Sequence, residues 1–128
     1  MYENQIKTLK KISKNWKNQD SQKKYPLRIL QDLIENGITE RIRIDSIKLI
    51  LDLKLKSQEI YKILENCLLS DDNPNVRGLT AKILLLIYPK ECKNIIKWAL
   101  RHETSPSVLK IIQDLSYAVN GHKLDFLD

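Results

Sequence analysis

The sequence repeats itself, first after 34 residues and then after 32, and this internal period limits the possible folds more than any other feature. Apolar positions recur in register as Ile29-Leu30 and Leu33-Ile34, Ile63-Leu64 and Cys67-Leu68, then Ile95-Ile96 and Ala99-Leu100. The segment after each of these recurs too, as Ile42-Arg43, Val76-Arg77 and Val108-Leu109. Such a period is typical of repeat proteins, in which each unit is one supersecondary element. We therefore expect residues 1–128 to form a single domain built as a short stack of similar units.

The apolar residues within each unit are spaced as in helices. Leu and Ile account for 20 and 17 residues while Val accounts for three, which favours helices over strands. Proline or glycine interrupts the pattern at Tyr25-Pro26, Asn36-Gly37, Asn73-Pro74, Tyr88-Pro89 and Ser105-Pro106. Natural N-cap residues precede the segments, namely Thr39, Ser57, Asn73 and Ser105. The sequence therefore predicts an all-α fold of helices about 12 to 16 residues long, joined by short turns.

Three parts follow from this pattern. Residues 1–24 are expected to be a basic N-terminal capping helix and linker, residues 25–120 the repeats, and residues 121–128 a C-terminal tail. The first helix has an apolar stripe of Tyr2, Ile6, Leu9, Ser13 and Trp16. The last helix and the tail could cover the other end through Tyr117, Val119, Leu124, Phe126 and Leu127.

The segment Asp71-Asp72-Asn73-Pro74-Asn75-Val76-Arg77, followed by Ala81 and Ile83-Leu84, resembles the HEAT repeat, and particularly its short HEAT-like (PBS-lyase-type) form. The resemblance is strongest over residues 71–102, weaker over 39–70 and partial over 106–120. It implies a short right-handed α-solenoid of about three helical hairpins, with Arg43 and Arg77 reaching the turns. The family is used for many ligands, so the resemblance specifies architecture rather than function.

The positive charge is confined to the N-terminal segment. The net charge is +6, and residues 1–28 alone carry eight basic and two acidic side chains, which gives +6; residues 29–128 carry fourteen of each. The lysines of the first helix are Lys7, Lys10, Lys11, Lys14 and Lys17. They are compatible with the solvated face of a capping helix, or with contact to nucleic acid, an acidic protein or an anionic membrane. Trp16 and Tyr25 lie among them and suit either base stacking or packing on the first hairpin.

Motifs for catalysis or metal binding are not found in the sequence. There is no nucleophile motif, glycine-rich phosphate loop or HExxH, and His102 and His122 lack metal-ligand spacing. Asp71 and Asp72 are explained by N-capping and an ion pair with Arg77. We therefore expect no enzyme, cofactor or metal site, and we expect Cys67 and Cys92 to be buried thiols.

One aromatic residue stands out on the non-core face of the helices that the HEAT-like register makes second in each hairpin. Trp98 occupies the position of Asp32 and Asn66 in the sister repeats. It is either an exposed binding anchor or a packing contact for the C-terminal tail. The leading hypothesis is a scaffold or adaptor module that binds a protein partner through Trp98, Lys97, Arg101, Glu65, Asn66, Leu69 and Lys62.

The alternative function is nucleic-acid binding through the basic first helix, in a protein related to the HEAT-like DNA glycosylases. The neutral body of the chain offers no residues that match their catalytic positions. The longest apolar run, Ile83 to Tyr88, is far below the roughly 18 residues of a membrane span. We therefore expect a soluble cytoplasmic protein without membrane contact, either a monomer or a weak homodimer.

Overall fold

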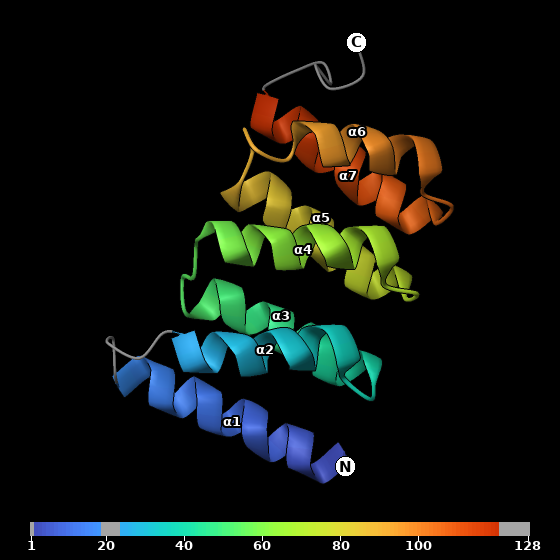
Figure 1. Ribbon diagram of the computed structural model, residues 1–128. Helices are drawn as coiled ribbons and strands as arrows, with labels where there is room; N and C mark the ends of the chain where they lie inside the picture. The colour runs from blue at the N-terminus through green and yellow to red at the C-terminus, as the bar shows by residue number, and fades with distance from the viewer. Residues whose placement is uncertain (1, 19–23, 121–128) are drawn as a thin grey trace. The chain divides into compact units, whose positions relative to one another are not determined.

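A computed structural model describes residues 2–18 and 24–120, and this part of the chain consists of seven α-helices without any strand (Figure 1). The helices are α1 (Tyr2–Asn18), α2 (Lys24–Asn36), α3 (Glu40–Asp52), α4 (Gln58–Ser70), α5 (Pro74–Ile87), α6 (Lys93–His102) and α7 (Pro106–Asn120). The all-α prediction is confirmed. The expected roles of the tail, and of the side chains of Tyr2, Trp16, Lys17, Tyr25 and Val119, lie outside the described residues.

The helix boundaries follow the period of the sequence. α2 and α4 begin 34 residues apart, as do α3 and α5, while α5 and α7 begin 32 residues apart. The expected caps explain these starting points. The side chains of Thr39 and Ser57 accept hydrogen bonds from the backbone N–H groups of Ile42 and Ile60, and Asn73 caps α5 in the same way. The repeat therefore exists in local structure as well as in sequence.

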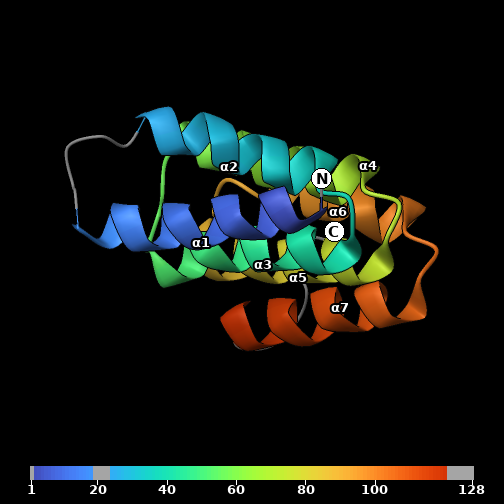
Figure 2. The same cartoon turned by 90° about the horizontal axis from the view of Figure 1, so that it is seen from below.

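The chain divides into two compact units, and the first, Met1–Lys56, contains α1, α2 and α3. In this unit α2 packs against α3, and α1 contacts both (Figure 2). The Oε1 atom of Gln5 accepts a hydrogen bond of 2.9 Å from the backbone N–H of Ile38, which fixes α1 to the α2–α3 turn. The buried residue of α1 is Ile12, at 6% exposure, whereas Ile6 and Leu9 of the expected stripe are half-buried.

The second unit, Ser57–Asp128, contains α4 to α7. Helix α4 packs along α5, α5 packs along α7, and α6 contacts both α4 and α7. Figures 1 and 2 show α4 and α6 in one layer of this unit and α5 and α7 in the other. The side chains enclosed between the helices include Leu64, Leu68, Ile83, Leu84, Ile96 and Ile112, all fully or almost fully buried.

Close packing of α5 on α7 depends on a glycine. A methyl group added at Gly78 would lie 3.0 Å from the Cδ1 atom of Ile111, tighter than most such contacts. The packing also differs from the HEAT-like register in one respect. Helix α5 packs mainly on α4 and α7, so α4 is the first helix of its closely packed pair, not the second.

Candidate functional site

Helix α6 has one buried face and one polar face. Ile95, Ile96 and Ala99 are buried beneath it. The opposite face is formed by Lys93, Asn94, Lys97, Trp98, Arg101 and His102, of which Lys97 is half-buried and the others are exposed. The helical spacing of the apolar residues therefore places the predicted residues of α6 on its outer surface.

Trp98 is held in place by a residue of its own helix. The indole is 40% exposed and stacks on the imidazole of His102, with ring centroids 4.4 Å apart and an angle of 18° between the planes. His102 Nδ1 lies 2.9 Å from the carbonyl oxygen of Trp98, and because a carbonyl can only accept, this nitrogen donates. The sequence analysis missed His102 as a partner, although its spacing of four residues from Trp98 is the signal for such a contact.

The other predicted residues lie on α4, which neighbours α6 in the same unit. Leu69 is 40% exposed, an unusual position for a large aliphatic side chain. Lys62 and Asn66 are exposed, and Glu65 is half-buried. By the repeat register Leu69 corresponds to Arg101, and Asn66 to Trp98. The seven residues predicted to bind a partner thus lie on two helices of one unit.

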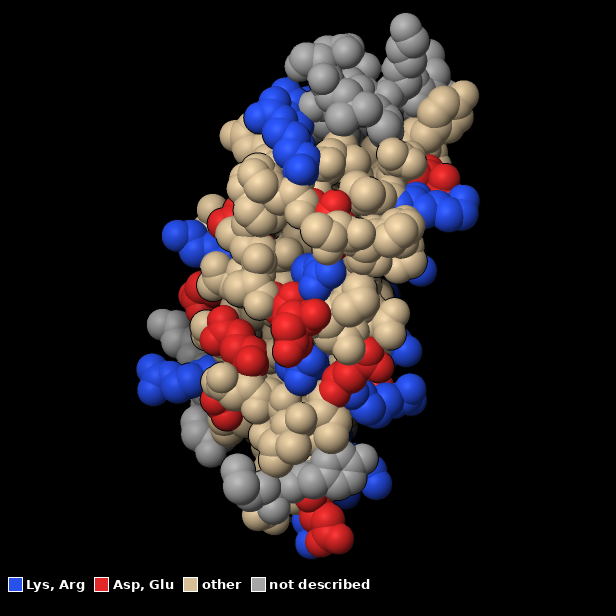
Figure 3. All heavy atoms as spheres, turned by 90° about the vertical axis from the view of Figure 1, so that its right-hand side faces the viewer, with Lys and Arg blue, Asp and Glu red and all other residues tan. Residues whose placement is uncertain are grey.

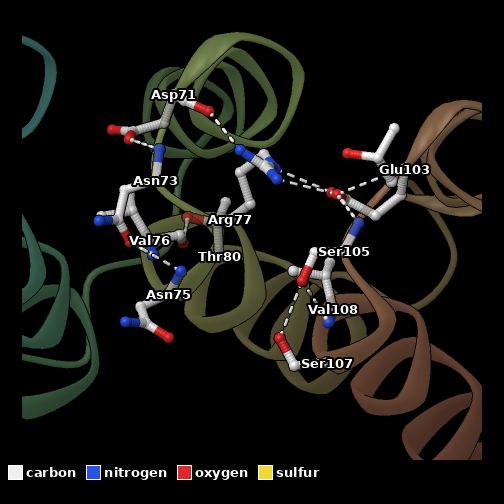
Figure 4. A network of polar contacts seen from close by, with 11 residues as sticks. Asp71, Asn73, Asn75, Val76, Arg77, Thr80, Glu103, Ser105, Ser107 and Val108 are labelled. Atoms are coloured by element: carbon white, nitrogen blue, oxygen red, sulfur yellow. Dashed lines mark hydrogen bonds and ion pairs between the residues drawn. The ribbon is translucent and has the colours of Figure 1, made fainter.

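A polar network joins the turn after α4 to the turn after α6 (Figure 4). Arg77 Nη1 donates to the carbonyl oxygen of Asp71 at 2.9 Å, while Nε and Nη2 donate to the two carboxylate oxygens of Glu103, both at 2.9 Å. The carboxylate of Glu103 also accepts from the backbone N–H groups of Thr104 and Ser105, each at 3.0 Å. Five short hydrogen bonds therefore connect the two turns.

The ion pair of Arg77 differs from the expected one. Its bidentate partner is Glu103, not the carboxylates of Asp71 and Asp72, because Glu103 is presented by the next short turn. The hydrogen bond from Arg77 holds the pKa of the Glu103 carboxyl below its ordinary value. The side chains of Arg77 and Glu103 are only 16% and 4% exposed, so this charged pair stabilises the fold and is not accessible to a ligand.

Both cysteines are buried, as predicted. The Sγ atom of Cys92 lies 3.8 Å from the carbonyl oxygen of Pro89, and burial raises the pKa of this thiol to about 11. Since the thiolate is the reactive form, Cys92 is protonated and inert at neutral pH.

Thiol labelling checks this interpretation. We expect iodoacetamide at about pH 8 to label neither Cys67 nor Cys92 in the folded protein, and to label both after unfolding in guanidinium chloride. Mass spectrometry counts the added groups. Labelling of the folded protein as fast as that of the unfolded chain would contradict the described burial.

The basic face of α1 is exposed at Lys7, Lys10, Lys11 and Lys14, while the side chain of Lys17 is outside the described residues. This arrangement fits a solvated face as well as a binding surface.

Searches of protein-family models, curated proteins and solved structures found no match to this chain. None of the helices in residues 2–18 and 24–120 combines the length and apolar character needed to cross a membrane. The same residues contain no cluster of three or more His, Cys, Asp or Glu side chains arranged to hold a metal ion. The functional argument therefore depends on the surface chemistry of α4 and α6.

Proposed function

We propose that this chain is a non-catalytic, HEAT-like adaptor module that binds a protein partner. The α4–α6 surface, defined as Lys62, Glu65, Asn66, Leu69, Lys97, Trp98 and Arg101, is the proposed binding site. The observation that carries the proposal is Trp98, a large aromatic side chain that is exposed although sister repeats place polar residues at its position.

Two features support a HEAT-like arrangement. The paired helices begin at constant offsets along the chain. In addition, Arg43 and Arg77 make the same local contact: each donates through Nη1 to the carbonyl oxygen six residues earlier, at 3.1 Å to Gly37 and 2.9 Å to Asp71. A repeated arginine that closes the turn between two helices is consistent with hairpins of one type, stacked as a right-handed solenoid.

Two further features support a protein partner. Trp and Arg are the residues most enriched where interfaces derive their binding energy, and Trp98 and Arg101 lie one helical turn apart on α6. Leu69 adds exposed aliphatic surface on the neighbouring helix. Stacking on His102 restrains Trp98 before binding, which reduces the conformational entropy lost on association.

Truncation of Trp98 tests the proposal. We expect Trp98→Ala to weaken partner binding by about 30-fold or more, the effect of losing an interface hot spot. The free energy of unfolding should change by no more than about 1 kcal/mol, since much of the indole is in solvent. Affinity capture from native lysate, followed by a binding titration with the captured protein and a thermal melt, measures both effects.

Tyr117→Ala is the matched control, because Tyr117 is an aromatic residue of the same unit with 58% exposure and lies on α7. It should bind like the wild-type chain. If Trp98→Ala captured the same proteins as wild type with unchanged affinity, or lost binding only because it unfolded, the α4–α6 surface would not be the binding site.

A further inference from the structure

A row of positive charges runs along α6. Lys93, Lys97 and Arg101 follow one another at intervals of four residues and therefore share one side of the helix. The parallel row next to it is Asn94, Trp98 and His102. α6 contains no acidic residue, and no ion pair within the described part of the chain involves the three cations. The row is therefore available to an external anion.

The repeat architecture does not require these cations. The corresponding residues of α4 are Tyr61, Glu65 and Leu69, which have no positive charge. A contribution to helix stability explains only part of the row. Arg101, in the last turn, faces the negative end of the helix dipole favourably, whereas Lys93 begins the helix at its positive end, where a cation is unfavourable.

We infer that the partner presents an acidic protein segment to α6, with carboxylates against Lys93, Lys97 and Arg101 and an apolar side chain against Trp98 and Leu69. This inference rests on the proposed function and specifies the chemistry of the partner. Charge complementarity selects the occupant: three unpaired cations beside an aromatic and an aliphatic side chain match a segment that alternates acidic and apolar residues.

A nucleic acid fits this surface less well. Phosphate backbones are bound by surfaces on which positive charge is extended, whereas Glu65 lies on the neighbouring helix and Leu69 offers an aliphatic contact. Figure 3 shows basic and acidic side chains interspersed on the face it presents, as is typical of protein-binding surfaces and of ordinary solvated ones. The acidic segment is therefore the occupant to test.

The probes are fluorescein-labelled 16-residue peptides and a single-stranded DNA of the same length. One peptide has Glu at every fourth position, each followed by Leu, and its counterpart has Gln in place of Glu. With the full wild-type chain at about 50 mM salt, we expect the Glu peptide to bind at least tenfold more tightly than the Gln peptide and more tightly than the DNA. Its affinity should fall several-fold at about 200 mM salt, because exposed charges are screened.

Two double variants separate local from overall charge. Lys97→Glu/Arg101→Glu and Lys82→Glu/Lys90→Glu each lower the formal net charge from +6 to +2, and Lys82 and Lys90 are exposed in the same unit, away from α6. Only the first double variant should abolish the preference for Glu over Gln. Thermal melts establish that both are folded.

Equal binding of the Glu and Gln peptides to wild type would overturn the inference. The same is true of equal losses in the two double variants, or of tighter binding to the DNA. If capture from lysate still required Trp98 in those cases, the proposed function would stand without the acidic partner. If Trp98→Ala captured partners as well as wild type, the proposed function itself would fail.

Discussion

Replacement of Leu64 by Ala is expected to lower the free energy of unfolding by about 2 to 5 kcal/mol. Leu64 is fully buried on α4, and Ile96, its counterpart in the next repeat, is fully buried on α6. Removal of three carbon atoms from either residue would lose apolar contacts and leave a cavity. Because small domains are stable by only about 5 to 15 kcal/mol, this is a large fraction of the total. Urea denaturation monitored by circular dichroism measures the change.

Lys62→Ala is the control on the same helix, two residues away from Leu64 and exposed. It should change the free energy of unfolding by no more than about 0.5 kcal/mol. If Leu64→Ala were as mild as Lys62→Ala, the interior positions assigned by the repeat register would be wrong. The outer surface of α4 and α6, and the binding site placed there, would then be wrong as well.

The second large effect is expected at the buried ion pair. Glu103→Gln should destabilise the protein by about 3 kcal/mol, since it leaves the largely buried guanidinium of Arg77 without its counter-charge. Arg41→Ala is the control: Arg41 pairs with Asp45 at 3.1 Å, but its side chain is 74% exposed, and such pairs contribute about 1 kcal/mol or less. Similar losses in the two variants would show that burial does not strengthen the Arg77–Glu103 pair.

The same pair makes stability depend on pH. The pKa of Glu103 is lower in the folded protein than in the unfolded chain, so the unfolded state binds its proton first as the pH falls. The stabilisation is therefore complete above the ordinary pKa of a glutamate and is lost as the pH falls through the lowered value. We expect the gap in stability between wild type and Glu103→Gln to be constant near neutral pH and to narrow between about pH 5 and pH 3. Urea titrations across this range provide the measurement.

The sequence by itself determined the local structure of this protein. The breaks at Gly37, Pro74 and Pro106, and the caps at Thr39, Ser57 and Asn73, set the limits of the helices, because they act on backbone groups within one turn. The apolar spacing also identified the buried faces of α4, α5 and α6, since three or four residues complete one turn of a helix. The outward position of Trp98 followed from the same spacing.

The tertiary structure alone decided which distant residues meet. Arg77 could be assigned to the nearby acids Asp71 and Asp72 from sequence, yet its carboxylate partner is Glu103, 26 residues further along. The contact of Gln5 with the N–H of Ile38, and the packing of α5 on both α4 and α7, have the same origin. Helical periodicity shows which face of a helix is apolar, but not which other helix covers it. That choice depends on how side chains of separate helices fit together in three dimensions.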